Sequence, residues 1–267
     1  MKQFFVVLIS AAFSVNICSA ACTDTDKIKK VEMYPTSAEL PANLLRFYLY
    51  FPYKVAARNV LNHITLQDST GRKVDGAFLE NRYDLWSPDR RRLTLLLNPG
   101  RVKTGLGAHD TLGRALIPGQ DYSLSVNETA LRGEHCKGRA KSVFRFSVTA
   151  ADIDPPKPDS WLMVTPAAGT LGPLVVDLGS PHDHLSLAFR LRVTDPEGVG
   201  VPGRIHLGPD ETVWRFTPSE PWSRSLHRLL IDETFEDLAG NRPSGVFDRP
   251  AGDRELSWTN ELEWRPR

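Results

Sequence analysis

Two histidines separated by one residue, His182 and His184, are the one histidine pair in this sequence with the spacing of metal ligands. On an extended strand alternate side chains point to the same face, so both imidazoles could reach one Zn²⁺ or Cu²⁺ ion. The preceding Ser180-Pro181 instead favours a bend that leads into a strand. The sequence has no cysteine cluster and no second histidine pair to complete a coordination shell, so we expect no metal here.

A second polar cluster lies near the end of the chain, where Glu236 and Asp237 precede Asn241. Their side-chain oxygens suit Ca²⁺, which acidic loops of extracellular modules bind, but the spacing is not that of an EF-hand. The alternative is a tight turn in which Asp237 accepts hydrogen bonds from backbone N–H groups and Gly240 is left-handed. We expect this turn, and keep Asp237 and Asn241 as secondary metal candidates.

The sequence contains none of the motifs that mark common catalytic centres. A Gly-x-Ser-x-Gly elbow, a His-Glu-x-x-His pair and a Gly-rich phosphate loop are all absent from it. Carboxylates are too numerous for any one pair to stand out as a glycosidase site. We therefore predict no catalytic residue and no cofactor, and keep a hydrolase with an unrecognised site as an alternative.

Six tryptophans offer another kind of site, because exposed indole rings can stack on sugars. Trp86 and Trp214 occupy similar places in the two halves of the chain, which predicts a packing role for both. Trp222, Trp258 and Trp264 are the better candidates for exposure and for contact with a ligand. A carbohydrate-binding accessory module is therefore a second functional alternative.

The first 21 residues have the features of an export signal. Lys2 is followed by the apolar run Phe4–Val15 and then by the small residues Ser19, Ala20 and Ala21. This run is too short to span a bilayer, and no later segment approaches the roughly 20 apolar residues of a membrane helix. We expect cleavage near Ala20 or Ala21, and a periplasmic or extracellular mature protein.

The charges of the mature chain are balanced. Removal of the leader takes away one lysine and no acid, which leaves 32 basic and 32 acidic residues. This balance argues against a nucleic-acid partner and against binding to an anionic membrane. The 20 prolines and 19 glycines are spread along the chain, a pattern that favours short strands over long helices.

A proline-rich polar stretch at 152–159 divides the chain, because it suits neither a helix nor a central strand. On both sides, short runs of alternating apolar residues lie between turn-forming residues, as half-buried strands require. Leu45–Phe51 is one such run and Leu187–Val193 is another. We expect a first domain at 22–151, this linker, and a second domain at 160–267 that ends in a C-terminal strand.

The two halves also share a repeated segment. Residues 64–78 align with residues 191–205 at a constant offset of 127, with matching apolar positions, aspartates and glycines. The pattern predicts a strand, a tight turn with a capping aspartate and a glycine at positive φ, and a return strand. Trp86 and Trp214 follow at an offset of 128. Two domains of the same fold are therefore expected.

Short motifs in both halves resemble those of bacterial SbsA-type immunoglobulin-like domains. In the second half these are Trp214–Pro218, Leu229–Asp232 and Glu236–Asn241, the last containing a D-x-x-G-N turn. The first half is similar at Leu85–Pro88 and Gly119–Tyr122, although its final turn differs. The resemblance covers about residues 31–248 and implies an all-β fold of two tandem immunoglobulin-like β-sandwich domains. Such modules occur in surface-layer proteins, in adhesins and in secreted enzymes.

Two cysteines remain once Cys18 has left with the leader, and Cys22 has two mutually exclusive interpretations. It could be the lipidated first residue of a lipoprotein, although Ser19 stands where such signals usually have leucine. The interpretation that we prefer is a disulfide with Cys136 in an oxidising compartment. In a sandwich of this type the first and last strands run parallel, which would bring the two cysteines close.

These observations favour an exported, non-catalytic protein whose loops or sheet edges contact a partner protein or another cell-envelope component. A glycan is the alternative ligand. Because one fold serves many functions, the resemblance does not identify the partner.

Overall fold

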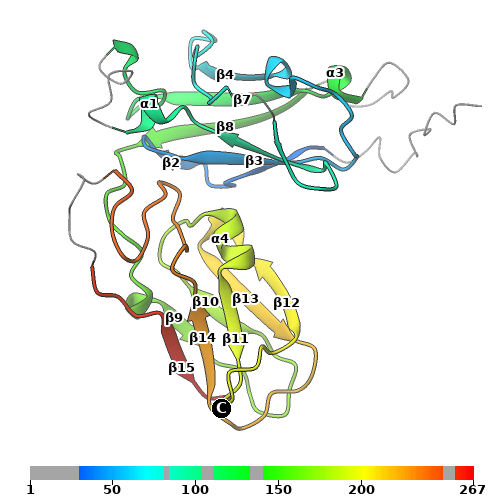
Figure 1. The fold of residues 1–267 in the computed structure, drawn as a ribbon, viewed down its shortest axis with the longest axis vertical. Helices are drawn as coiled ribbons and strands as arrows, with labels where there is room; N and C mark the ends of the chain where they lie inside the picture. Colours follow the sequence, from blue (N-terminus) through cyan, green and yellow to red (C-terminus); the bar gives the residue numbers. More distant parts are fainter. Residues whose placement is uncertain (1–29, 81–83, 104–110, 133–140, 249–255) are drawn as a thin grey trace, which may run out of the picture.

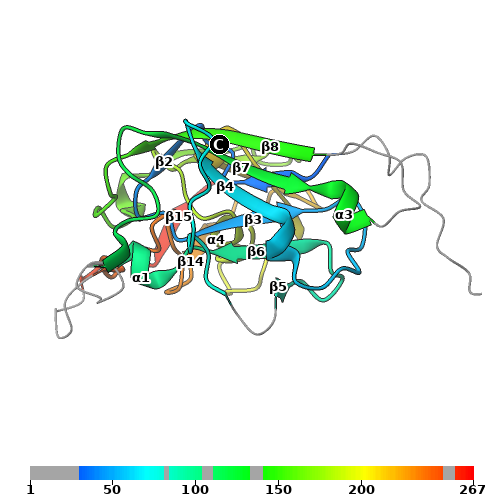
Figure 2. The same cartoon turned by 90° about the horizontal axis from the view of Figure 1, so that it is seen from above.

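The computed structural model describes residues 30–80, 84–103, 111–132, 141–248 and 256–267. These residues form two β-sandwiches, one above the other in Figure 1, with the strands of the upper one running across the view and those of the lower one running down it. Seen from above, the second sandwich lies beneath the first (Figure 2). One end of the second sandwich therefore meets one face of the first.

The first sandwich contains two four-stranded sheets. One sheet has the order β1 (Glu32–Tyr34), β3 (Arg46–Tyr50), β6 (Arg92–Leu96) and β5 (Leu85–Trp86). The other has the order β2 (Glu39–Pro41), β8 (Lys141–Thr149), β7 (Asp121–Asn127) and β4 (Ile64–Asp68). Neighbouring strands are antiparallel except β2 and β8, which are parallel. Short helical segments connect them: η2 (Val60–His63), α1 (Pro99–Val102) and α3 (Glu128–Arg132).

The second sandwich contains a four-stranded and a three-stranded sheet. The larger sheet has the order β12 (Gly203–Leu207), β13 (Val213–Pro218), β10 (Leu174–Asp177) and β9 (Leu162–Val164). The smaller has the order β11 (Leu191–Thr194), β14 (His227–Ile231) and β15 (Glu261–Trp264). The tail that we expect to end in a strand contributes β15. The remaining elements are η3 (Pro158–Ser160), α4 (His184–Phe189) and η4 (Pro209–Glu211).

This strand order is that of immunoglobulin domains. When the strands of each half are lettered along the chain, A, B, E and D form one sheet, and C, F and G form the other. The first half adds β2, a short strand paired in parallel with the last strand. At the start of its strand F, the hydroxyl of Tyr122 accepts a hydrogen bond of 3.1 Å from the backbone N–H of Ile117, as in the tyrosine corner of such domains. The chain is therefore an all-β protein of two tandem immunoglobulin-like sandwiches.

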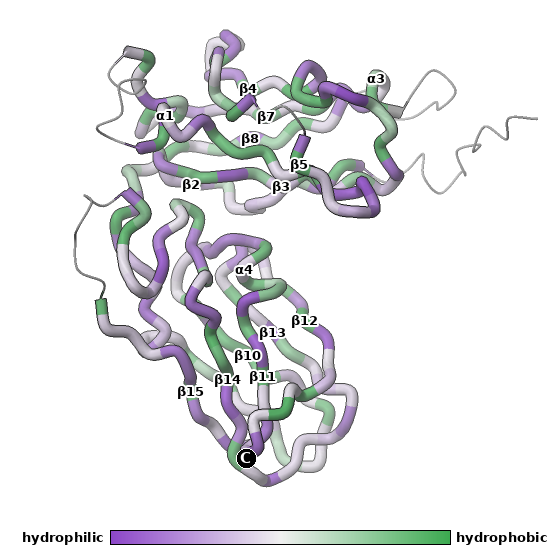
Figure 3. The backbone as a smooth tube through the Cα atoms, in the orientation of Figure 1, coloured by the Kyte–Doolittle hydropathy of each residue, from purple (hydrophilic) through white to green (hydrophobic). Residues whose placement is uncertain are grey.

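Each sandwich has its own hydrophobic core, built from the alternating apolar residues of its strands. In β3, Phe47 and Leu49 point into the first core, and in β10, Leu174 and Val176 point into the second. Hydrophobic and hydrophilic segments alternate along the strands of both sandwiches (Figure 3). Burial of alternate side chains between two sheets is what fixes the register of these strands.

The tight turn predicted by the repeat at an offset of 127 is confirmed, but the predicted return strand is wrong. After each turn the chain forms only one bridge back to the preceding strand, Gln67–Lys73 or Thr194–Gly200, and β12 pairs with β13 in the other sheet. In the first half the N–H of Gly71 donates to the carbonyl of Asp68 at 2.9 Å, and in the second the N–H of Gly198 donates to that of Asp195 at 3.1 Å. Both glycines have a φ of 82°, where a residue with a side chain would be strained. The turns that join β4 and β11 to their return segments therefore have one geometry.

The expected equivalence of Trp86 and Trp214 is wrong. Trp86 lies on β5, the edge strand D, and is only partly buried, whereas Trp214 lies on β13, strand E, and is fully buried. The intervening loops differ between the halves, so a similar sequence offset places the two rings on different strands.

The expected strand at Leu187–Val193 is also wrong in its first part. Asp183 caps α4 by accepting a hydrogen bond of 2.9 Å from the N–H of Ser186. The strand β11 begins only at Leu191, and Phe189 is 70% exposed at the end of the helix. A local capping interaction therefore overrides the apolar alternation here.

Candidate functional site at the junction of the two sandwiches

The outer face of β3 is where the first sandwich meets the second. Arg46, Tyr48 and Tyr50 alternate with the core residues of this strand and so point away from the first core. Tyr48 is nevertheless only 1% exposed. Asp183, at the start of α4, contacts Tyr48, and Glu236, in the loop after β14, contacts Arg46. Figure 1 shows α4 beneath the sheet that contains β3. A face that would be solvated in an isolated domain is therefore an interface here.

Tyr48 and Asp183 form the buried centre of this interface. The Tyr48 hydroxyl donates a hydrogen bond of 2.8 Å to Oδ2 of Asp183, while Oδ1 of Asp183 caps α4. Burial, together with the Asp183 carboxylate, raises the pKa of Tyr48, so that the phenol remains a donor. The bond thus orients the start of α4 against β3.

Arg46 supplies the positive charge beside this pair. Its guanidinium donates to the carboxylate of Glu236, and its Nε lies 3.8 Å from Oδ2 of Asp183. Arg242 donates to the other oxygen of Glu236 at 2.9 Å. Glu236 is therefore held between one arginine of each sandwich. Because the side chain of Glu236 is only 13% exposed, loss of an arginine would leave a largely buried carboxylate without one of its partners.

A second set of contacts joins the start of the first sandwich to η4. Glu211 is 1% exposed, and its carboxylate accepts hydrogen bonds from the backbone N–H of Thr36 at 2.8 Å and from the Thr36 hydroxyl. The ring of His184 lies 3.8 Å from the ring of Tyr34, centroid to centroid. Nδ1 of His184 is 3.8 Å from Oε1 of Glu211. Glu211 has a φ of 53°, and the Thr36 contact helps to hold this strained backbone.

The loop after β14 provides the third set of contacts. Oδ1 of Asp237 accepts from the N–H groups of Ala239 and Asn241 at 2.8 and 2.9 Å, and Gly240 has a φ of 79°. The turn expected at this D-x-x-G-N sequence is thus confirmed. The carbonyl of Leu238 accepts a hydrogen bond of 2.9 Å from the N–H of Leu45, and Leu238 packs against the first core. The turn is therefore part of the junction.

Asn241 links this turn to the linker. Its amide donates to Oδ2 of Asp237 at 2.9 Å and to the carbonyl of Asp152 at 3.1 Å. The side chain of Asn43, in the first sandwich, makes two hydrogen bonds of 2.8 Å with the backbone of Asp152. Its Nδ2 donates to the carbonyl of Asp152, and its Oδ1 accepts from the N–H of Asp152. Burial, together with the nearby Asp152, raises the pKa of Asp237 to about 7. The oxygens of Asp237 and Asn241 are thus engaged in the turn rather than arranged as a metal shell.

The structure separates the two histidines of the candidate metal pair. Because α4 begins between them, His182 packs against Trp161 and Phe235, whereas His184 lies against Tyr34. Nδ1 of His182 is 2.8 Å from the carbonyl of Ser180, and burial lowers its pKa to about 4. The alternative in which both imidazoles share a strand face is therefore wrong. The expected bend is present at residues 179–180, but it leads into α4 and not into a strand. Among the described residues, no three His, Cys, Asp or Glu side chains are placed to hold one metal ion.

A pocket of about 430 Å³ lies on the linker side of the junction. Its lining includes Asp152, Lys157, Trp161, His182 and Asp237. This volume would admit a small molecule. Nδ1 of His182 and Oδ1 of Asp237 already bond to backbone atoms, whereas Nε2 of His182 is buried without a hydrogen-bond partner. Much of the remaining wall is the proline-rich stretch around Pro155 and Pro156. The pocket therefore has few free groups to orient a ligand.

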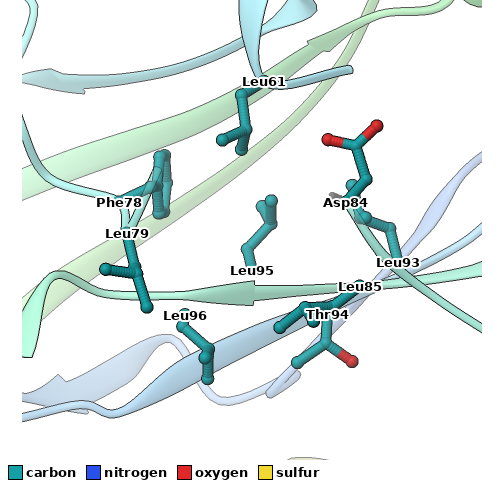
Figure 4. A pocket seen from close by; sticks show the side chains of 9 residues that line it. All are labelled: Leu61, Phe78, Leu79, Asp84, Leu85, Leu93, Thr94, Leu95 and Leu96. Atoms are coloured by element: carbon teal, nitrogen blue, oxygen red, sulfur yellow. The ribbon is translucent and has the colours of Figure 1, made fainter. Parts of the chain in front are cut away.

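Figure 4 shows a second, smaller cavity, inside the first sandwich. It holds about 20 Å³, and its lining is apolar except for Thr94 and Asp84, whose carboxylate lies at one side. Oδ2 of Asp84 accepts a hydrogen bond of 3.5 Å from the N–H of Val60. This space is enough for about one water molecule and is too small for a substrate.

The expectation of exposed tryptophans is wrong for Trp222 and Trp264. Both belong to the second core, and their rings pack against each other 4.9 Å apart, centroid to centroid. Nε1 of Trp222 donates to the carbonyl of Gly172 at 2.7 Å, which satisfies its polar atom in the interior. Trp258 is partly buried against the same core. The large apolar area of the indole ring outweighs its capacity for ligand stacking here.

The predictions at the amino terminus and at the two cysteines fall outside the described residues. Residues 1–21, Cys22 and Cys136 belong to this part of the chain. Within the described residues, Val31 and Val143 line one groove, so the strands that follow the two cysteines lie side by side. Among the same residues, the structure contains no helix with the length and apolar character needed to cross a membrane.

Arg46 and Tyr48 are not among the site residues expected from the sequence, because alternation alone assigns them to the solvated face of a strand. A usable signal was present. Tyr34, Tyr48 and Tyr50 place three aromatic rings on one outer face, and such an apolar face usually indicates a covered surface.

No family model matches the chain, and no curated protein matches it. Similar solved structures include the titin domains Z1Z2 in complex with telethonin, at 13% identity, covering 70% of this chain and 79% of that one, with a TM-score of 0.20. Tandem Ig repeats of Dlar are 12% identical, with 78% and 92% coverage and a TM-score of 0.23. Because these TM-scores lie far below 0.5, the immunoglobulin-like class is assigned here from strand order.

Proposed function

We propose that this chain is an exported, non-catalytic protein whose two immunoglobulin-like sandwiches act as one rigid unit and bind a partner protein of the cell envelope. The observation that carries the proposal is the buried junction centred on Tyr48 and Asp183. Contacts between domains of one chain usually permit relative motion. A junction of paired charges and a buried hydrogen bond instead fixes how the loops and edges of both domains are presented.

A fixed arrangement favours recognition, because a preorganised surface loses less conformational entropy when a partner binds. A buried charge without a partner is costly, so the pairing of Glu236 with Arg46 and Arg242 favours the one relative placement of the domains that brings the three side chains together. The proposal includes removal of residues 1–21, a disulfide between Cys22 and Cys136, and a periplasmic or extracellular location. It also includes a relationship to the SbsA-type immunoglobulin-like domains.

Affinity capture from the envelope fraction of the native source tests the binding function. The purified chain is compared with a variant in which Arg46→Ala and Tyr48→Phe loosen the junction, and with Lys73→Ala, at an exposed turn away from the junction, as the control. We expect one discrete protein to be retained by the wild type and by the control, and lost by the loosened variant. Retention of an oligosaccharide alone would contradict the proposal, as would equal retention by the loosened variant.

Export is tested separately by cell fractionation and intact mass measurement. We expect the mature chain in the envelope or the medium, with a mass that corresponds to cleavage near Ala20 or Ala21 and to one disulfide. A lipid on Cys22 would contradict the disulfide and show that the chain is anchored to a membrane. An uncleaved chain in the cytoplasm would contradict export.

A further inference from the structure

Strand β8 has an edge that is only partly covered. The strand contains nine residues, but β2 pairs only with its last three, Ser147–Thr149. Among the described residues, no strand pairs with that side of 141–146. The other side of β8 is paired with β7 over residues 141–147. The first two thirds of β8 therefore form an open edge of the sheet.

The backbone groups of this edge can be assigned from its hydrogen bonds. The N–H of Ser147 donates to Ala38, next to β2, at 2.8 Å, whereas the N–H of Val148 donates to Gln120, next to β7, at 2.9 Å. Peptide groups alternate in direction along a strand. The N–H and C=O groups of Val143 and Arg145 therefore point to the open side, where a further strand could pair with them.

A groove of about 290 Å³ runs along this edge, between β8 and β1. On its inner side lie Val31 and Met33, which are buried, and Phe144, which packs against the same core. Apolar side chains of an entering strand would therefore find an apolar surface on the inner side. On the outer face, Val143 is 41% exposed.

The charges around the groove are mainly positive. Lys141 and Arg145 are exposed on the outer face of β8, and Lys30 is exposed at the end of the groove. Glu32 is the one acidic residue of the described lining, and it accepts a hydrogen bond from the hydroxyl of Tyr34 at 3.2 Å. Acidic side chains on the outer face of an entering strand would complement these cations.

We propose that the open edge of β8 binds an extended segment of the partner protein in which apolar and acidic residues alternate. The apolar side chains enter the groove beside Val31 and Phe144, and the acidic ones lie beside Lys141 and Arg145. Backbone pairing with Val143 and Arg145 supplies affinity, and the alternation supplies specificity. This inference rests on the proposed function and names the site and the partner's chemistry.

Peptide binding to the ¹⁵N-labelled purified protein tests the inference. The probe is an acetylated heptapeptide of alternating valine and glutamate, and the control is one of alternating valine and lysine. We expect the amide signals of Val143 and Arg145 to shift with the first peptide, and binding of the second to be weaker by at least about tenfold. Shifts confined to another edge, such as β12, would overturn the assignment, as would equal binding of the two peptides.

Two variants separate backbone pairing from charge. Val143→Pro removes an N–H on the open side, which an edge strand tolerates, and should weaken peptide binding at least about tenfold, whereas Val143→Thr should not. Arg145→Glu should also weaken binding, whereas Lys73→Glu, the same charge change at an exposed turn, should not. Unchanged binding in both test variants would overturn the inference.

Other occupants of the edge would also be detected. Concentration-dependent dimerisation that shifts the same amides, or cross-strand nuclear Overhauser effects from residues 22–29 to Val143, would overturn the inference. The peptide could fail to bind while the wild-type chain still captures a protein that the loosened junction variant loses. This result would reject the β8 edge as the binding site and leave the proposed function standing. Peptide binding without any such captured protein would support the edge and count against the envelope partner.

Discussion

The hydroxyl of Tyr48 in the first sandwich donates a 2.8 Å hydrogen bond to the carboxylate of Asp183 in the second, across a sequence separation of 135 residues. The other oxygen of the same carboxylate accepts from the N–H of Ser186 and so begins α4. One side chain therefore fixes both the start of this helix and its position against β3. Arg46 lies beside the pair and brings the positive charge that the buried carboxylate requires.

Removal of the Tyr48 hydroxyl should destabilise the protein without unfolding either core. Tyr48→Phe leaves a buried carboxylate with one hydrogen bond fewer, at a cost of about 2 kcal/mol in the free energy of unfolding. Urea denaturation followed by tryptophan fluorescence measures this change. The matched control is Tyr34→Phe, which removes an exposed hydrogen bond and should cost less than about 0.5 kcal/mol. Equal effects of the two changes would contradict the central role of Tyr48.

Gly240 should be more sensitive to substitution than other glycines at positive φ. A Cβ at this position would lie 2.7 Å from Cδ2 of Leu45, across the junction. Gly198 has a similar φ but nothing within 4 Å of the corresponding atom. We expect Gly198→Ala to cost about 1 kcal/mol for the backbone alone, and Gly240→Ala to cost at least about 1 kcal/mol more. Thermal denaturation of the two variants gives the comparison, and equal costs would count against close packing here.

Asp237 should make the junction more stable in acid. Its pKa of about 7 in the folded protein lies above the ordinary value of 3.8, because the charged form is buried beside Asp152. A raised folded pKa contributes stability that is fully present below about pH 4 and is lost as the pH rises to about 7.

The variant Asp237→Asn isolates this effect, because it does not titrate. The difference in unfolding free energy between wild type and variant should fall by on the order of 3 kcal/mol between pH 4 and pH 8. A difference that is constant over this range, or one that grows with pH, would show that the carboxylate is not buried as described.

His182 should stay neutral well into the acidic range. Burial lowers its pKa to about 4, and the short contact with the carbonyl of Ser180 places the proton on Nδ1. The imidazole signals, assigned with His182→Asn, should show the Nδ1–H tautomer at pH 6. A lowered folded pKa of a base contributes stability that is lost as the pH falls from about 6.5 to about 4. Protonation of His182 near pH 6.5 would contradict its burial.

The parts of this fold that depend on local patterns could be predicted from the sequence. The aspartate and glycine turns after β4 and β11 were predictable because Asp68, Gly71 and their counterparts satisfy backbone groups within a few residues. The turn at Asp237 was predictable for the same reason. Alternation of apolar residues gave the core face of β3, since period-two burial is a property of the strand itself.

The junction could not be predicted in this way, because its contacts join residues far apart in the chain. Alternation places Tyr48 on the outer face of its strand. The tyrosines on that face can indicate that it is covered, but only the structure shows that α4 covers it. The same limit explains the error at Trp222 and Trp264, whose burial depends on how β15 packs beside β14. His182 and His184 diverge because Asp183 caps a helix between them.

The rigidity of the tandem is measured most directly by residual dipolar couplings of backbone amides in one weakly aligned sample. If the Tyr48–Asp183 junction locks the sandwiches together, couplings from residues 31–149 and from residues 162–264 will fit a single alignment tensor. In the variant with Arg46→Ala and Tyr48→Phe, the two sets should require separate tensors. Separate tensors in the wild-type protein would contradict the account.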